Sequence, residues 1–197
     1  VTPELQIFRT SEGATFAIEI CEDVWAPTPP SNHLALAGAE IIFNLSTSDE
    51  LIGKHTYLKS LLAQQSARTI SGYVYSSSGF GESTQDVVFG GNALIFENGS
   101  LVKQSERFQI DPQLVISEID IENLRSERRT NSTFVNAQRP VASGLAGVTG
   151  QIDELALHVD CLPPLNPMRE FTLTREFDQH PFIPKSENMQ EACDEIY

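Results

Sequence analysis

The segment 15–25 constrains the fold of this chain more than any other. Residues 15–20 (TFAIEI) are apolar and rich in β-forming side chains, which predicts a strand. Cys21 ends that strand, and Glu22 and Asp23 follow in a turn or short helix. A nucleophile at a strand-to-helix junction is held by rigid elements, near backbone N–H groups that can receive an oxyanion. The local pattern fits a buried structural cysteine equally well, because free cysteine is among the most buried residue types.

Apolar strands and amphipathic helices alternate along the first two thirds of the chain. Strands are predicted at 15–20, 41–43, 73–76, 87–89, 93–96, 101–102 and 114–119. Helices are predicted at 31–39, 54–70 and 122–128, with Ser31 and Asp120 as N-caps. Asn98-Gly99 is typical of a hairpin turn. This alternation is typical of an α/β fold.

Beyond residue 130 the periodic pattern weakens. Residues 131–170 contain several Gly and Pro residues, and we interpret them as an extended arm or loop. Residues 171–174 (FTLT) predict an edge strand. Ser186 is a predicted N-cap for a last helix over 187–197.

Composition excludes several classes of function. The formal net charge is −14 over 197 residues, which argues against binding to nucleic acid or to an anionic membrane. No apolar run approaches the roughly 20 residues that a membrane-spanning helix needs. The cysteines are Cys21, Cys161 and Cys193, an odd and widely spaced set that suggests reduced thiols in a cytoplasm. The four histidines form no metal-ligand spacing, so we expect no metal site.

Several blocks resemble one family in the same order along the chain. The run 20–30 (ICEDVWAPTPP) is similar to the cysteine motif of the glutaminase part of glutamine-dependent NAD synthetases, which belong to the nitrilase superfamily. Further matching blocks are 35–39 (ALAGA), 44–48 (NLSTS), 65–68 (QSAR), 73–76 (YVYS), 81–84 (GEST), Asp86 and 89–91 (FGG). The resemblance is dense over 15–108. The cysteine motif indicates the superfamily, and its combination with GEST indicates the synthetases.

The resemblance implies a fold and a division of the chain. The fold of the superfamily is a four-layer α-β-β-α sandwich, of which we expect this chain to hold the C-terminal half. We expect a partial glutaminase domain at 1–130, an extended arm at 131–177, and at 178–197 a connector and the first helix of a synthetase domain. Because the chain begins with Val1, we expect it to be part of a longer protein. We also expect that protein to form a homo-oligomer.

The same resemblance assigns Cys21 as the nucleophile. A free thiol with a pKa near 8.5 is only a few per cent thiolate at about pH 7, so it needs a base close by. In the superfamily that base is a glutamate, and a lysine steadies the intermediate, both well before the cysteine. Only twenty residues precede Cys21, none of them lysine, and Glu19 is too close to match the base. We expect both partners outside this chain.

Two further residues, Ser48 and Lys54, match positions that contact glutamine in the family, and we expect Glu22 to line the same site. A free amino acid has a carboxylate that suits a cation and hydroxyl donors. Each residue has a structural alternative: Glu22 at a helix dipole, Ser48 as the cap of the next helix, and Lys54 on the solvated surface. We expect no cofactor site in this chain, since ATP and Mg²⁺ belong to the synthetase domain.

The predicted function is the glutaminase step of NAD synthesis, with glutamine as substrate and the synthetase domain of the same polypeptide as partner. Two alternatives stay open. One is a stand-alone amidase of the nitrilase superfamily, against which the connector near 180–184 argues. The other is a non-catalytic fragment, which the missing glutamate and lysine favour for the isolated chain.

Overall fold

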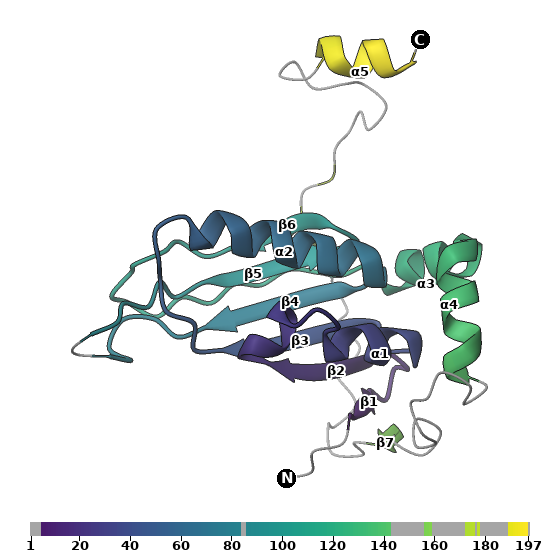
Figure 1. Cartoon of the computed structure of the whole chain (residues 1–197), viewed down its shortest axis with the longest axis horizontal. Coiled ribbons are helices and arrows are strands. Elements are labelled where there is room, and N and C mark those ends of the chain that lie inside the picture. The colour runs from purple at the N-terminus through teal and green to yellow at the C-terminus, as the bar shows by residue number, and fades with distance from the viewer. Residues whose placement is uncertain are drawn as a thin grey trace.

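The computed structural model describes residues 5–83, 86–142, 156–158, 172–175, 177 and 189–196. Their framework is a seven-stranded mixed sheet with the order β6-β5-β4-β3-β2-β1-β7 (Figure 1). The strands are β1 (Ile7–Arg9), β2 (Thr15–Ile20), β3 (Ile41–Ser46), β4 (Gly72–Ser77), β5 (Ala93–Glu97), β6 (Ser100–Gln104) and β7 (Ala156–His158).

The centre of the sheet is parallel. Strands β2, β3 and β4 run in one direction, while β1 and β5 flank them antiparallel and β7 pairs parallel to β1. Strands β5 and β6 form the predicted hairpin, in which Asn98 and Gly99 both have positive φ (44° and 88°). Because the central strands are parallel, the residues that follow β2, β3 and β4 meet at one edge.

The helices are η1 (Cys21–Trp25, a 3₁₀ turn), α1 (Pro30–Leu36), α2 (Lys54–Thr69), α3 (Ile121–Thr130), α4 (Ser132–Ala142) and α5 (Met189–Ile196). Of these, η1, α1 and α2 cover one face of the sheet. Figure 1 shows α1 and α2 lying over the sheet and running roughly along its strands, with α3 and α4 beyond one end of α2. No helix in the part of the chain that the structure describes is long and apolar enough to span a membrane.

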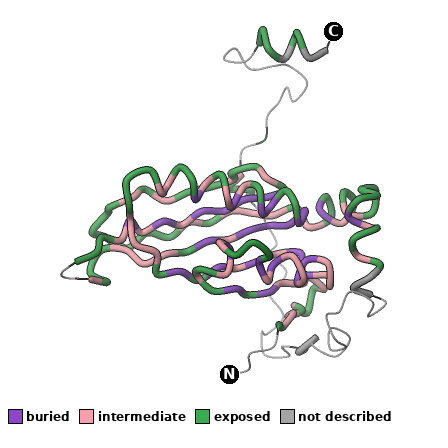
Figure 2. Tube along the Cα trace, viewed as in Figure 1, coloured by how far each residue is buried: buried purple, intermediate pink, exposed green. Residues whose placement is uncertain are grey.

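The two faces of the sheet differ in burial. The core combines inward side chains of the central strands with the faces of the helices, and its members are Ala17, Val24, Leu34, Ala39, Ile42, Leu58, Leu62, Tyr73, Tyr75, Leu94 and Phe96. On the opposite face Ile18, Ile20 and Leu45 are 42%, 63% and 54% exposed. The alternation of buried and exposed residues along the strands is visible in Figure 2. The sequence of β2 therefore carries apolar residues for both faces, although only one is covered here.

The α/β class predicted from the sequence is confirmed, as are the strands at 15–20, 41–43, 73–76 and 93–96 and the helix at 54–70. Asp120 caps α3 as expected, because its carboxylate accepts from the N–H of Asn123 at 2.9 Å. Ser31 was predicted to cap α1, which is wrong: Pro29 is the N-cap, and Ser31 is buried inside the helix.

Three predicted strands do not form. Residues 87–89 contribute only an isolated bridge between Asp49 and Phe89, and residues 114–119 and 172–174 are irregular. Each segment is apolar, but it has no neighbouring strand with which to pair: Val88, Leu114 and Leu173 are all largely exposed. Apolar character without a partner ladder does not make a strand.

The predicted extended arm contains structure that the sequence analysis missed. Helix α4 occupies 132–142, and its start was signalled by Asn131, whose side chain accepts from the N–H of Phe134 at 2.9 Å. Strand β7 lies in the same region, and the short β1 was also missed. At the C-terminus, α5 lies within the helix predicted at 187–197, while the connector at 180–184 lies outside the described residues.

Candidate active site

Cys21 lies at the junction of β2 and η1, as the sequence predicted. Its φ of +49° is a left-handed conformation that non-glycine residues seldom adopt. The junction is fixed by Asp23, whose carboxylate accepts a hydrogen bond from the N–H of Ile20 at 2.7 Å. Cys21 is partly buried, a free thiol at the mouth of a pocket rather than a core residue. The strained backbone places the side chain at the edge of the sheet, where a nucleophile is accessible.

Side chains of the neighbouring strands β3 and β4 hold this cysteine through hydrogen bonds. The hydroxyl of Ser46 on β3 donates to the sulfur of Cys21 at 3.4 Å, and the hydroxyl of Tyr75 on β4 donates to Ser46 at 2.9 Å. The amide of Asn44 donates to the carbonyl of Cys21 at 3.4 Å and to the hydroxyl of Tyr73 at 3.3 Å. All four supports point to the helix-covered face because they alternate along parallel strands in register.

Glu19, on the same face of β2, anchors the other end of this chain of hydrogen bonds. It is buried and accepts from the hydroxyl of Tyr73 and, at 2.9 Å, from the N–H of Ser31 at the start of α1. Burial, together with the adjacent Glu19, raises the pKa of Tyr73 well above its ordinary value, so this phenol stays a neutral donor. Glu19 therefore serves the structure beneath Cys21, consistent with its exclusion as the catalytic base.

A polar pocket of about 400 Å³ opens beside the sulfur. It forms where the ends of β2 and β3 meet the start of α2, and it is lined by Cys21, Glu22, Trp25, Thr47, Ser48, Asp49 and Lys54. The four residues predicted from the sequence, one nucleophile and three substrate contacts, thus line a single pocket. Their roles stay predictions, but their convergence from three separate segments is what a substrate site requires.

Lys54, the first residue of α2, projects into this pocket. Its ammonium donates to the main-chain carbonyl and to the carboxylate of Asp49, both at 2.8 Å, and lies 5.8 Å from the centre of the Trp25 ring. The ion pair with Lys54 lowers the pKa of Asp49. An ammonium has three N–H donors, so Lys54 keeps one for a ligand after binding Asp49.

The structure decides the structural alternative for Ser48 but not for Glu22. Ser48 does not cap α2, because Gly53 occupies the N-cap position, and the N–H of Ser48 instead donates to the hydroxyl of Ser77 at 3.2 Å. Glu22 is exposed in the first turn of η1, so both its contact with the pocket and a dipole interaction are compatible with its position.

Sequence reasoning missed Trp25, Thr47 and Asp49 as members of the pocket. Trp25 stacks on Tyr57 of α2 with ring centroids 5.5 Å apart, which holds η1 against the start of the helix. Trp25 and Thr47 lie inside the blocks that resemble the synthetases, so the signal existed for both. Asp49 follows directly after such a block and is reached only through the loop geometry.

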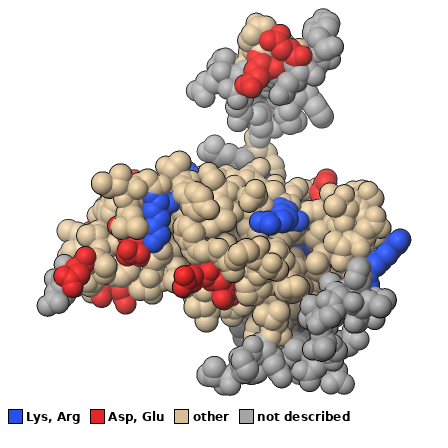
Figure 3. All heavy atoms as spheres, in the orientation of Figure 1, with Lys and Arg blue, Asp and Glu red and all other residues tan. Residues whose placement is uncertain are grey.

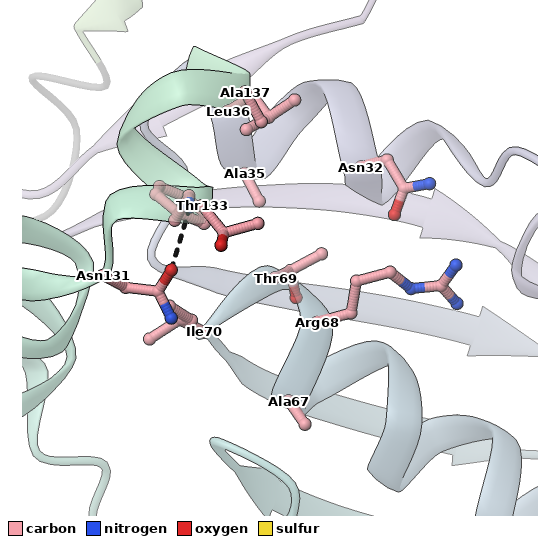
Figure 4. A pocket seen from close by; sticks show the side chains of 11 residues that line it. Asn32, Ala35, Leu36, Ala67, Arg68, Thr69, Ile70, Asn131, Thr133 and Ala137 are labelled. Carbon is pink, nitrogen blue, oxygen red and sulfur yellow. Dashed lines mark hydrogen bonds between the residues drawn. The ribbon is translucent and has the colours of Figure 1, made fainter.

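A second and larger cavity lies away from the cysteine, at the other end of α2. It has about 540 Å³ and is formed by α1, the end of α2 and the start of α4 (Figure 4). Its walls are mostly apolar, and in Figure 4 the polar groups near its edge include Asn131, already bonded within its own helix start, and Arg68. The cavity offers volume without a nucleophile or a convergent polar set, so we do not assign a reaction to it.

Charge and metal-binding potential give further limits. Among the residues that the structure describes, no group of three or more His, Cys, Asp and Glu side chains is placed to hold a metal ion. On the face drawn in Figure 3, Lys and Arg side chains of these residues are dispersed between acidic ones rather than joined in a basic patch. The visible charge pattern agrees with the acidic composition.

Comparison with known proteins identifies relatives of the whole chain. The model of the carbon-nitrogen hydrolase family matches residues 2–129. Glutamine-dependent NAD(+) synthetase of Mycobacterium tuberculosis strain H37Rv is 37% identical over 195 residues, which cover 97% of this chain and 27% of that protein. The Mycobacterium leprae protein of the same name is 38% identical over 94% of this chain and 26% of its own length. The chain thus spans about a quarter of these relatives.

Solved structures support the fold. A carbon-nitrogen hydrolase from Helicobacter pylori G27 superposes with a TM-score of 0.56 at 17% identity, over 69% of this chain and 50% of that chain. A glutamine-dependent NAD+ synthetase from Acinetobacter baumannii superposes with a TM-score of 0.51 at 22% identity, over 56% of this chain and 20% of that chain. Since the family model matches well over half of its residues, the chain belongs to the carbon-nitrogen hydrolase family.

Proposed function

We propose that this chain carries the glutaminase site of a glutamine-dependent NAD synthetase. The observation that carries the proposal is the pocket in which Cys21, Glu22, Ser48 and Lys54 converge. The mycobacterial relatives bear that activity in their names and are similar over nearly the whole chain. The nucleophile lies at the strand-to-helix junction where an acyl-transfer site needs it.

The reaction is the hydrolysis of the side-chain amide of glutamine in two steps. The sulfur of Cys21 attacks the amide carbon, the carbon–nitrogen bond breaks, and ammonia leaves after the nitrogen receives a proton. A γ-glutamyl thioester remains on the enzyme. Water then attacks the thioester carbon, the carbon–sulfur bond breaks, and glutamate leaves with the thiol restored.

Substrate recognition follows from the charges of the pocket. The free N–H of Lys54 suits the α-carboxylate of glutamine, while Glu22 and Asp49 present carboxylates to its α-ammonium group. The Ser48 hydroxyl adds a donor beside them. A pocket with one cation and two anions selects a zwitterion over a simple amide, because only an amino acid neutralises both signs.

Other parts of the reaction belong outside these residues in our proposal. The general base and the stabilising lysine come from sequence preceding this chain, and the synthetase domain with ATP and Mg²⁺ follows it. Residues 1–130 then form part of the glutaminase domain and 178–197 lead into the synthetase domain. The ammonia released at Cys21 would pass to deamido-NAD in that domain of the same polypeptide, within a homo-oligomer.

The test replaces Cys21 in the full polypeptide. Cys21→Ala is expected to abolish NAD formation driven by glutamine and to leave formation driven by added ammonia unchanged, because the thiol serves only the amide step. Cys193→Ser is the matched control, since that exposed thiol lies on α5. Glutamine-driven synthesis that survives Cys21→Ala refutes the assignment. Glutaminase activity without any NAD formation would instead favour a stand-alone amidase of the same superfamily.

A further inference from the structure

Ser46 is the protein group that bonds directly to the sulfur of Cys21 among the residues described. Its hydroxyl lies 3.4 Å from that sulfur, and the hydroxyl of Tyr75 lies 2.9 Å from Ser46 on the opposite side. Both side chains are buried. We propose that Ser46 is a further catalytic residue, which donates a hydrogen bond to the Cys21 sulfur, and that Tyr75 is the positioning residue that fixes the direction of this bond. The inference rests on the proposed role of Cys21 as nucleophile.

The two hydrogen bonds that join Tyr75 to Ser46 and Ser46 to Cys21, which we call the relay, have one consistent direction of donation. A hydroxyl has one proton to donate and two lone pairs to accept with. Ser46 accepts from Tyr75, so its single proton is left to point at the sulfur. Apart from Cys21, the hydroxyl of Ser46 has no acceptor among the described hydrogen bonds. A sulfur accepts such a bond far better as a thiolate than as a thiol, so the relay favours the nucleophilic form.

The relay is built into the register of the sheet. Ser46 and Tyr75 face the same side from adjacent parallel strands, and Cys21 follows β2 level with the end of β3. Asn44 holds the carbonyl of Cys21 from the same side, at 3.4 Å, so main chain and side chain of the nucleophile are fixed together. A serine placed for packing alone would not need a tyrosine hydroxyl aimed at its oxygen.

Ser46 acts in both chemical steps, and its hydroxyl keeps its proton throughout. Ser46 stabilises the thiolate before attack, releases the bond as the carbon–sulfur bond forms, and donates again when the sulfur leaves the thioester. The base that takes the thiol proton is a separate group. Loss of the Ser46 hydroxyl is therefore expected to lower kcat more than it changes KM for glutamine.

The experiment measures the thiol directly in the full polypeptide. Iodoacetamide alkylation of Cys21 is followed by peptide mass spectrometry across a pH series, and Cys193 in the same molecule serves as an internal control because it is exposed on α5. Ser46→Ala is expected to slow the alkylation of Cys21 near pH 7 about fivefold and to lower kcat about tenfold. Tyr75→Phe is expected to lower kcat about threefold, because the serine proton is then free to turn away.

Two further variants separate catalysis from folding. Ser46→Thr keeps the hydroxyl and should restore the alkylation profile. Ser66→Ala removes another buried hydroxyl that also donates once (to Ser71 O, 2.7 Å) and accepts once (from Gly99 N, 3.1 Å), but at the far end of α2. It should leave the profile of Cys21 unchanged.

The outcomes distinguish this inference from the proposed function. An unchanged alkylation profile and kcat in folded Ser46→Ala, together with loss of glutaminase activity in Cys21→Ala, overturns the role of Ser46 alone. Glutamine-driven synthesis that persists in Cys21→Ala overturns the proposed function. Slower alkylation that Ser46→Thr does not reverse assigns the effect to packing and also overturns the relay.

Discussion

A cation lies close to an aromatic ring near each end of helix α2, but the two cations serve different purposes. Each end places a cation over an aromatic ring: Lys54 lies 5.8 Å from the centre of Trp25, and Arg128 lies 5.0 Å from the centre of Phe134. A cavity lies near each pair, and Figure 4 shows the one at the carboxyl end of α2. The difference lies in what the remaining donors of each cation bind.

At the amino end the cation is left partly available. Lys54 binds only Asp49, and 21% of its side chain is exposed toward the polar pocket of Cys21. At the carboxyl end Arg128 donates to three main-chain carbonyls, those of Ala39, Thr69 and Ile70, at 2.8–3.0 Å. Two of these are the last carbonyls of α2, which no turn of the helix can satisfy.

Burial lowers the pKa of Arg128 to about 10, so the guanidinium remains charged at neutral pH and keeps these three hydrogen bonds. A cation that holds three main-chain carbonyls stabilises the fold, whereas one with a spare donor beside a pocket can bind a ligand. Cavity volume is therefore a poor guide to function: the smaller pocket is the one lined by a thiol and by an ammonium with a spare donor, whereas the larger cavity is mostly apolar and its lining cation is Arg68.

The largest expected effect is on the free energy of unfolding, and it comes from removing the cation at the carboxyl end of α2. Arg128→Met in the full polypeptide should lower the free energy of unfolding by about 3 kcal/mol, because three partly buried carbonyls lose their donors together. Lys54→Met, the matched change at the amino end, should cost less than about 1 kcal/mol, since its ion pair is partly exposed. Urea denaturation measures both. Equal losses at the two ends would remove the distinction between them.

The sequence was sufficient for the parts of this fold that depend on local pattern. The strand at 15–20, the helix at 54–70 and the Asn98-Gly99 hairpin all carry their own signals in apolar period or turn residues. The junction that holds Cys21 was predicted in the same way. The four predicted pocket residues were found by resemblance, and their convergence follows from the parallel pairing of β2 with β3.

The remaining features depend on partners that no local pattern names. Strand β1 is only three residues long and exists because β2 pairs with it, while the apolar run 114–119 has no such partner and stays irregular. The relay from Tyr75 through Ser46 likewise requires the register of three strands. Ile18, Ile20 and Leu45 are exposed on the open face of the sheet. In a nitrilase-like sandwich, a second sheet packs against this face.

A smaller effect is expected on KM for glutamine when the cation at the amino end of α2 is removed. Lys54→Ala should raise KM for glutamine about tenfold and change kcat little, because in the proposed role its ammonium binds the α-carboxylate equally in ground and transition states. Arg68→Ala is the matched control: it removes a cation from the last turn of the same helix, at the wall of the other cavity. Steady-state glutaminase kinetics test the pair. An unchanged KM in Lys54→Ala would show that Lys54 is a solvated surface residue and does not bind glutamine.

The smallest effect concerns the carboxylates near the two ends. Asp49 pairs with Lys54, and Glu40 pairs with Arg125 of α3 and accepts from the N–H of Thr15 at 2.9 Å. Burial raises the pKa of Glu40, but the bonds from Arg125 and Thr15 outweigh it, so the pKa lies below the ordinary 4.5. The side chain of Glu40 is 8% exposed and that of Asp49 is 40% exposed. Solvent therefore screens the Asp49 pair more strongly.

A carboxylate with a depressed pKa in the folded state stabilises the protein above its unfolded pKa, and the contribution is lost as pH falls through the folded value. Glu40→Gln should therefore lower the free energy of unfolding by about 1 kcal/mol near pH 7. The gap from the parent should close as pH falls below 4.5, where Glu40 of the parent becomes protonated. Asp49→Asn should stay within about 0.5 kcal/mol of the parent throughout. Urea denaturation at a series of pH values measures both, and a gap for Glu40→Gln that persists under acid would show that packing, not charge, makes this site stable.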